Sequence, residues 1–336
     1  MRKSISLTAL AAMVAMMALT GPARADLLPG EKDAAIQPID GVVAAGSAWE
    51  LAWAGFMTAD GMVGTDDGGL LFAQEQSNSI RKLGPDGKEY VYRANVAGVG
   101  AVSIDAKGRL FAVERTCTDP GLHRPSCNEL TRVVQIAPEQ RLIANSFADG
   151  KGLGRLNDLM ADGFGGAYYT QTGLYHARAD GSVSVIADMD IFTNGVILSP
   201  DGKTLYVTNR TKVVAFDVGK DGTATNRRDF ATLSRDSGGF GGDGLAVDSE
   251  GRLYVTGDAG VYVFDKAGKE LGVIPVPRRA ITIAFSGPGK QTLYVGAMGA
   301  VGPDGKAWAT PEGVRNVAMT IYRVKTVATG FQGRAK

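Results

Sequence analysis

Four residues with carboxylate or amide side chains stand at equivalent points of a repeated sequence pattern. They are Asp60, Asn157, Asn194 and Asp243, and each opens a short apolar segment. Carboxylate and amide oxygens are the ligands that hard divalent cations such as Ca²⁺ and Mg²⁺ prefer, and they also suit Mn²⁺. Two carboxylates brought together without a cation would repel, and one of them would be driven to hold a proton. If the fold brings the four residues together, they predict a metal site, and a polar channel filled with water is the alternative.

The repeat that carries these residues is a short apolar strand, a turn rich in Asp, Gly, Ser or Pro, and a second strand with strong β-propensity. Residues 244–256 and 196–208 are its clearest copies. Six copies have their equivalent first positions at Asp60, Gly100, Asn157, Asn194, Asp243 and Thr282. The intervals between these positions are 40, 57, 37, 49 and 39 residues. Periods near 40–50 residues with several short strands each are typical of β-propeller blades.

The predicted fold class is therefore all-β, and the predicted architecture is a six-bladed β-propeller. The innermost strand of every blade of a propeller lines a central channel, so the six first positions would point at one axis. A strand near Trp49 to Trp53 could complete the last blade and close the ring without an exposed edge. The glycine content predicts many tight turns, because 46 of 336 residues are Gly, about twice the usual share of ~7%. A β-sandwich is the rival fold, but it would not need the repeat.

The first 25 residues have the pattern of a secretory signal peptide. Arg2 and Lys3 precede an apolar run over residues 5–19, and residues 22–25 offer a small-x-small cleavage motif. The apolar run has about 15 residues, and a membrane-spanning helix needs ~20, so cleavage is favoured over an anchor. We expect residues 26–336 to form a single propeller domain that is periplasmic or secreted, with no membrane span after cleavage.

The charge of the mature chain excludes some classes of partner. Without Arg2, Lys3 and Arg24, the 36 basic residues fall to 33, against 35 acidic residues. A nearly neutral chain argues against nucleic acid or an anionic membrane as the main partner. The chain has two histidines, His123 and His176, which makes a Ser-His-Asp triad or a His-rich zinc site difficult to build.

The two cysteines of the chain are Cys117 and Cys127, separated by nine residues of loop character. In an oxidising compartment we expect a disulfide that closes this loop. Two unpaired thiols are the alternative. A metal-binding pair is disfavoured, because His123 is the only other soft ligand nearby.

Three motifs around the first positions carry a resemblance to a known family. They are Arg155-Leu156-Asn157-Asp158, Thr193-Asn194-Gly195 and Gly242-Asp243-Gly244. With these blade openings, the chain resembles the senescence-marker-protein/gluconolactonase family of regucalcin-like six-bladed propellers. The resemblance extends from about residue 60 to residue 295.

This resemblance implies roles for individual residues. Asn194 and Asp243 would be metal ligands, and Asp243 would also act as the catalytic base. Arg155 and Asn157 would face the substrate, and Asn157 could complete the metal shell. The first acidic ligand of the family is a Glu followed by Gly-Pro, and the matching segment here is Asp60-Gly61-Met62. Because Asp is one methylene shorter than Glu, the ion must lie closer to Asp60 or use a bridging water.

The activity that the resemblance implies is hydrolysis of a sugar-type or other small lactone to its hydroxy acid. The expected cofactor is a divalent metal, Ca²⁺ first, with Mg²⁺, Mn²⁺ or Zn²⁺ as alternatives. A binding propeller whose ion is only structural, or whose site is degenerate, is the alternative function. A quinone-dependent sugar oxidoreductase is a third possibility, but the sequence has no obvious cluster of cations for the quinone carboxylates.

Overall fold

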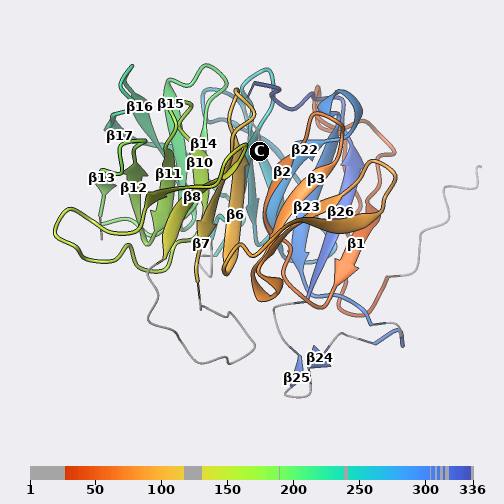
Figure 1. Cartoon of the computed structure of the whole chain (residues 1–336). Helices are drawn as coiled ribbons and strands as arrows, with labels where there is room; N and C mark the ends of the chain where they lie inside the picture. The colour runs from red at the N-terminus through yellow and green to blue at the C-terminus, as the bar shows by residue number, and fades with distance from the viewer. Residues whose placement is uncertain are drawn as a thin grey trace, which may run out of the picture.

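The structure is a computed structural model of the chain. It describes residues 27–116, 131–188, 190–237, 241–302, 304–306, 309–310, 313–314 and 318–333. The signal-peptide prediction and the Cys117–Cys127 prediction fall outside the described residues. Six four-stranded antiparallel sheets make up most of the described chain, and its helices are two 3₁₀ turns, η1 (Glu75–Ser77) and η2 (Pro288–Lys290). The sheets stand around a common centre (Figure 1).

Each of the first five sheets is an up-and-down meander of consecutive strands. Blade 1 contains β2 (Asp60–Gly64), β3 (Leu70–Gln74), β4 (Ser79–Leu83) and β5 (Glu89–Ala94). Blade 2 contains β6 (Val99–Ile104), β7 (Leu110–Glu114), β8 (Arg132–Ala137) and β9 (Arg141–Ala144). Blade 3 contains β10 (Leu159–Ala161), β11 (Ala167–Gln171), β12 (Gly173–Ala177) and β13 (Val183–Ala187). Blade 4 contains β14 (Thr193–Leu198), β15 (Thr204–Asn209), β16 (Lys212–Val218) and β17 (Ala224–Thr232). Blade 5 contains β18 (Leu245–Val247), β19 (Leu253–Gly257), β20 (Gly260–Phe264) and β21 (Glu270–Ile274).

The sixth blade joins the two ends of the ring. It has β22 (Ala280–Ser286), β23 (Thr292–Met298) and β26 (Met319–Lys325), and its outermost strand is β1 (Glu50–Gly55) from the N-terminal part of the chain. The pairs Glu50 with Arg323 and Gly55 with Met319 fix the register of β1 against β26. The predicted closing strand near Trp49 to Trp53 is therefore confirmed. A short hairpin, β24 (Ala309–Thr310) and β25 (Gly313–Val314), lies between β23 and β26 in sequence.

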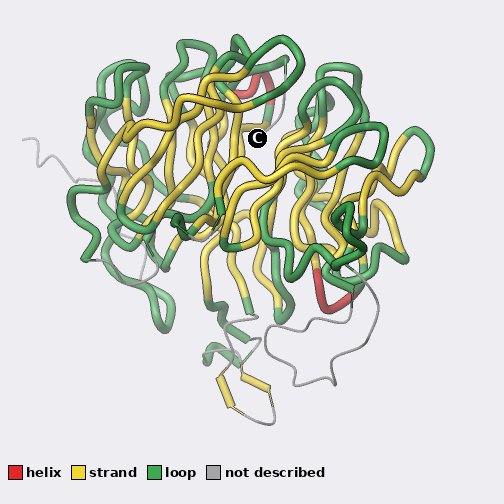
Figure 2. Tube along the Cα trace, turned by 90° about the vertical axis from the view of Figure 1, so that its left-hand side faces the viewer, coloured by secondary structure: helices red, strands yellow, loops and turns green. Residues whose placement is uncertain are grey.

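The inner strands contact one another in a closed circle. The order of contacts is β2, β6, β10, β14, β18, β22 and back to β2. Figure 2 shows the strands of neighbouring sheets running side by side, with loops at both ends. The fold is therefore the predicted six-bladed β-propeller.

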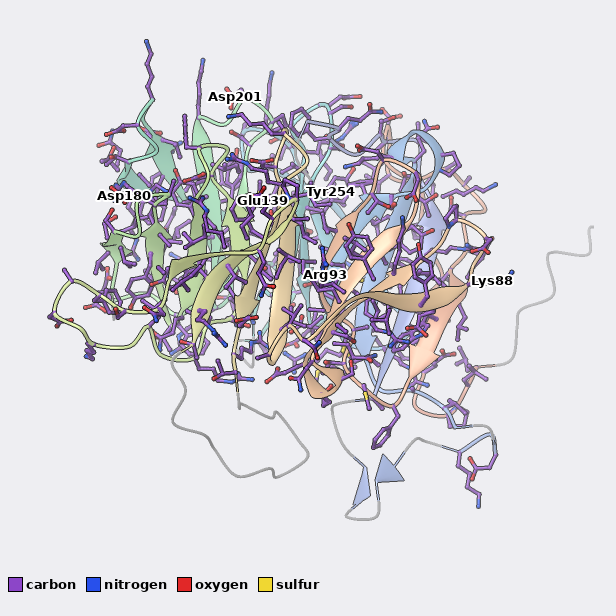
Figure 3. All side chains as sticks on the ribbon, in the orientation of Figure 1. Lys88, Arg93, Glu139, Asp180, Asp201 and Tyr254 are labelled. Atoms are coloured by element: carbon purple, nitrogen blue, oxygen red, sulfur yellow. The ribbon has the colours of Figure 1, made fainter. Side chains whose placement is uncertain are left out.

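Apolar side chains fill the space between adjacent blades. Val63 and Leu71 of blade 1 pack with Val102 and Leu110 of blade 2 in one cluster. Figure 3 shows the contrast at two residues: Tyr254 lies fully buried among the strands, whereas Lys88 points away from them. Since burial of one large apolar side chain contributes about 1.5–3 kcal/mol, these inter-blade layers hold the ring in the geometry that the centre requires.

The C-terminal segment crosses one end of the ring. Gly330 donates its backbone N–H to Lys290, and Phe331 donates to Val247 at the end of β18. These contacts lie at the end of the inner strands opposite to their first positions, which therefore face the other end. None of the helices in the described part of the chain has the length and apolar character that crossing a membrane requires.

Candidate metal and substrate site

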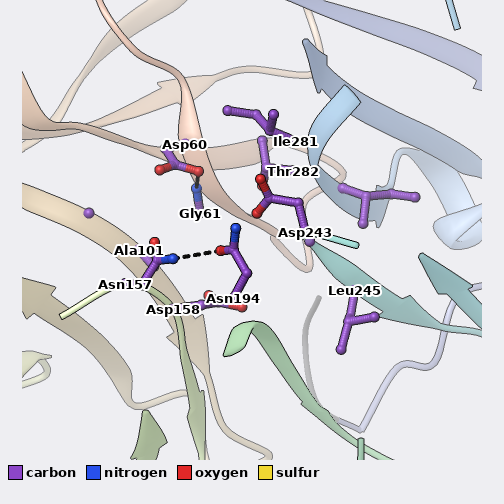
Figure 4. Close-up of a pocket in the computed structure, with 13 residues that line it drawn as sticks. Asp60, Gly61, Ala101, Asn157, Asp158, Asn194, Asp243, Leu245, Ile281 and Thr282 are labelled. Carbon is purple, nitrogen blue, oxygen red and sulfur yellow. Dashed lines mark hydrogen bonds between the residues drawn. The ribbon is translucent and has the colours of Figure 1, made fainter. Parts of the chain in front are cut away.

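The six first positions of the repeat meet in one pocket at the ring axis. Asp60, Gly100, Asn157, Asn194, Asp243 and Thr282 all line it. Each lies at the first residue of an inner strand or within two residues of it. Figure 4 shows the side chains of Asp60, Asn194 and Asp243 pointing toward one another. The free space at the centre is about 10 Å³, which suits a single water molecule or ion.

Irregular starts of the inner strands turn these side chains toward the axis. The register shifts between Asp60 and Val63 in β2, and between Thr193 and Val196 in β14. Such bulges bend a strand and redirect a side chain, and they are common at functional sites. The same shift occurs near the start of β6 and of β22.

The glycine after a first position has a packing reason. A Cβ placed on Gly244 would lie 2.8 Å from the Thr282 Cα of the next blade. A Cβ on Gly61 or Gly195 would collide with the backbone of the following blade in the same way. The Asp-Gly and Asn-Gly pairs therefore combine a polar ring residue with a close approach of neighbouring inner strands.

The Asp243 carboxylate is in an electrostatically unfavourable position. Burial raises the pKa of Asp243 well above its usual range, and the nearby carboxylates of Asp60 and Asp158 raise it further. Arg279 and Arg115 oppose this effect without cancelling it. Within the described residues, the Asp243 carboxylate accepts no hydrogen bond. A group in this state favours a proton or a bound cation.

The two amides of the ring are joined directly. Asn157 donates from Nδ2 to Oδ1 of Asn194 over 2.7 Å (Figure 4). Asn157 is anchored because its backbone N–H donates to Thr170, and Thr170 Oγ1 in turn donates to the Asn194 carbonyl over 2.5 Å. The ring thus contains two carboxylates and a coupled pair of amides.

Three groups that the sequence analysis did not select also belong to the site. Arg115, which follows β7, is 4% exposed and donates from Nη1 to Glu75 Oε2 over 2.8 Å. The same Nη1 lies 3.6 Å from the Asp60 carboxylate. Burial alone would lower the pKa of Arg115, but the charges of Glu75 and Asp60 outweigh it and raise that pKa. Asp158 is buried and accepts the backbone N–H groups of Leu159 and Val196, so it connects blades 3 and 4.

Arg155 lies at the rim of the site. Its side chain is 50% exposed, and its Nη2 is 3.8 Å from the Glu75 carboxylate. Burial and the neighbouring Arg115 charge lower the pKa of Arg155. The structure therefore brings Asp60, Asn157, Asn194 and Asp243 together and leaves Arg155 open to solvent beside them.

The fold and this site define a class: a six-bladed β-propeller with a polar, acidic cluster at one end of its channel. Comparison with known proteins places the chain within that class. The sequence profile of the SMP-30/gluconolactonase/LRE-like region matches residues 58–299. The chain therefore belongs to this family, and the resemblance inferred from the three motifs is confirmed.

Individual relatives have lactonase or regucalcin names. A pentonolactonase from Haloferax volcanii is 31% identical over 278 residues, covering 79% of this chain and 89% of that protein. A gluconolactonase from Zymomonas mobilis is 22% identical over 335 residues, covering 86% of this chain and 91% of the relative. Regucalcin from Xenopus laevis is 29% identical and covers 68% of this chain and 79% of its own length.

Solved structures share the fold. A gluconolactonase from Xanthomonas campestris superposes with a TM-score of 0.66 at 21% identity, covering 90% of this chain and 97% of that structure. A calcium-binding regucalcin from Agrobacterium tumefaciens gives a TM-score of 0.59 at 18% identity, covering 83% and 95%.

Proposed function

We propose that the protein hydrolyses a sugar-type or other small lactone with the help of one divalent cation. The observation that carries this proposal is the meeting of Asp60, Asn157, Asn194 and Asp243 in one pocket. Membership of the family, and the lactonase names of relatives that align over most of their length, support the same activity.

The residues of the pocket fit a hard cation. Two carboxylates and two amides provide oxygen donors of the kind that Ca²⁺ takes. The raised pKa of Asp243, caused first by burial and then by the Asp60 and Asp158 charges, is the imbalance that a bound cation would remove. In the described ranges, no three His, Cys, Asp or Glu side chains come together as a metal cluster, so the site depends on the amides. When bound, the ion would polarise the lactone carbonyl and stabilise negative charge on its oxygen.

The side chains of the chain itself account for the remaining chemistry. Ester hydrolysis adds a water oxygen to the carbonyl carbon and breaks its bond to the ring oxygen. The Asp243 carboxylate takes the proton of that water, and the proton finally goes to the ring oxygen as it leaves as a hydroxyl. Because the central space is about 10 Å³, the lactone ring must lie outward of it, at the rim. There the exposed Arg155 guanidinium can donate to a sugar hydroxyl or to the carboxylate of the product.

The direct test uses pH-stat titration to measure acid release from a panel of sugar and aliphatic lactones. We expect hydrolysis by the cation-loaded protein, loss of hydrolysis with a chelator, and recovery when Ca²⁺ is restored. Asp243→Asn should remove turnover. Absence of hydrolysis across the panel by protein shown to hold the cation would reject the lactonase and favour the binding propeller. Reduction of a dye after addition of a quinone would instead support an oxidoreductase.

One observation favours the binding propeller as the second candidate. Arg115 already provides a positive charge 3.6 Å from Asp60, and Asp60 replaces the longer Glu of the family pattern. Tight cation binding without turnover on any lactone is the outcome that this candidate predicts.

Export and the disulfide remain predictions. If residues 1–25 are removed, the chain recovered from the periplasm or medium should have the mass of a chain that begins at Asp26. If Cys117 and Cys127 are joined, an alkylating reagent should modify neither before reduction and both after it.

A further inference from the structure

The second blade places a glycine where each of the five other blades places a side chain that contains an oxygen atom. Gly100 lines the pocket at the first position of its blade, and a Cβ placed on it would collide with the Arg115 guanidinium. The missing side chain of blade 2 is therefore replaced by a cation that comes from the end of β7 in the same blade.

The Arg115 guanidinium of blade 2 donates to groups of blades 1 and 3. Nε donates to the Leu156 carbonyl over 2.8 Å, and Nη1 donates to Glu75 over 2.8 Å. Nη2 donates to both the carbonyl and the Oδ1 of Asn157, over 3.0 and 2.9 Å. Glu75 is also buried, with 3% exposure. Because Arg115 and Glu75 are both buried and the guanidinium has this many partners, the guanidinium is held in one orientation.

That orientation fixes the direction of the amide pair. A guanidinium can only donate, so Asn157 must turn its Oδ1 toward Arg115 and its Nδ2 toward Asn194. Asn194 must then offer Oδ1 to Asn157. Its Nδ2 consequently lies on the side of Asp60 and Asp243, as Figure 4 shows.

A cation between the two carboxylates needs the opposite end of the Asn194 amide. Cations bind amide oxygen, and the NH₂ group only donates. If Asn194 rotates to present its oxygen, two NH₂ groups face each other and the Asn157–Asn194 bond is lost. Asn157 cannot rotate to follow, because Arg115 would then face an NH₂ group.

We propose that Arg115 is a positioning residue that sets the Asn157 and Asn194 amides in the donor direction and so lowers the affinity of the site for a divalent cation. The inference rests on the cation site of the proposed function but not on lactone hydrolysis. Without an ion, the Asn194 amide would present its NH₂ group on the side where an ion needs an oxygen.

The decisive variant is R115M/E75Q, because it removes the buried charge pair together and leaves the net charge of the site unchanged. Calcium binding is measured by isothermal titration after chelator treatment. The hydrogen bond that ion binding breaks in the wild type is worth ~1 kcal/mol, which is about a fivefold change in Kd. We expect R115M/E75Q to bind calcium about fivefold more tightly, and an equal or weaker affinity would overturn the proposal.

Two further variants separate orientation from other effects. G100A keeps both charges but displaces the guanidinium, and it should also tighten calcium binding. N194D offers one oxygen to Asn157 and keeps the other for the ion, so R115M/E75Q should add nothing in that background. A gain of the same size in the N194D background would show that orientation is not the cause.

A matched control lies at the opposite end of the same blade. Arg109 donates from Nε to the Asp105 carboxylate over 2.7 Å, in the turn between β6 and β7. R109M/D105N removes this pair and should leave calcium affinity unchanged.

A readout without any ion keeps the inference separate from the proposed function. In protein labelled with ¹⁵N at Asn, the side-chain amide of Asn157 should be protected from exchange in the wild type and lose this protection in R115M/E75Q. If the exchange protection of the Asn157 side-chain amide is unchanged, the orienting role of Arg115 is refuted, whether or not any of these proteins binds calcium. Protection that is lost while no protein binds calcium would keep the orienting role and reject the cation site.

Discussion

Replacing Asp243 by Asn should make the protein more stable and less able to hold a cation. Burial, followed by the charges of Asp60 and Asp158, raises the pKa of this carboxylate. A buried polar group without partners costs about 1–3 kcal/mol. Unfolding entropy of ~2.1 cal/mol/K per residue converts this to a Tm increase of about 2–4 °C for Asp243→Asn without cation.

The pH dependence of this effect follows from the direction of the shift. An acid whose folded pKa is raised binds more protons in the folded than in the unfolded state, so stability falls as pH rises from its unfolded value of ~3.9 toward the folded pKa. The variant lacks this loss. Wild type and Asp243→Asn should therefore have similar Tm values near about pH 4 and differ most near about pH 7.

Addition of calcium should reverse the order. A ligand at 100 times its Kd stabilises the folded state by about 2.7 kcal/mol, or about 4 °C here. The wild type should gain this increase in thermal scans, and Asp243→Asn should gain almost none. A variant that melts below the wild type in chelator, or that gains as much from calcium, would refute the reasoning.

Asp248 provides a matched control in the same blade. It is fully buried but accepts hydrogen bonds from Arg252 Nε over 2.7 Å and from Tyr254 Oη over 2.9 Å. Since its charge has partners, Asp248→Asn should lower the Tm. The opposite signs of the two changes separate an uncompensated carboxylate from a general effect of burial.

Three further predictions concern two residues of the site and one at the opposite end of blade 3. Asn194→Ala should weaken calcium binding by about tenfold or more and remove hydrolysis, as measured by titration and acid release; unchanged values for both would contradict its place in the site. Asp60→Glu should preserve or raise hydrolysis by restoring the family side chain, and complete loss would show that the pocket is built around Asp. Burial alone would raise the pKa of Asp162, but the hydrogen bonds from His176 and from the backbone of Phe164 and Gly166 outweigh it and lower that pKa. The stability that Asp162 contributes is therefore present above its unfolded-state pKa of ~3.9 and is lost as pH falls through its folded-state pKa. Asp162→Asn should flatten the fall in Tm below about pH 4. An unaltered acid transition would contradict this prediction.

The repeat made the ring and its polar centre predictable. Its period gave six blades, and placing Asp60, Asn157, Asn194 and Asp243 at the same phase was enough to bring them to one axis. The closing strand was also predictable, because a sixth unit with too few strands needs a partner from the other end of the chain. These features depend on local patterning, which a single sequence records directly.

Glu75 and Arg115 could not be found in the same way. They lie in or after the ends of the second strands rather than at the first positions, and they meet only because blades 1 and 2 pack side by side. The one available signal was Gly100, a glycine in a series of mostly polar first positions. Its meaning depends on the guanidinium that fills its space, which the spacing of the repeat does not encode.

The most direct test of the cation site is a crystal structure of the calcium-loaded protein, recorded at a long wavelength where calcium scatters anomalously. We expect one strong peak on the ring axis, about 2.3–2.6 Å from carboxylate oxygens of Asp60 and Asp243 and from the amide oxygen of Asn194. A fully loaded crystal with no peak between these residues, or with its peak elsewhere on the protein, would contradict it.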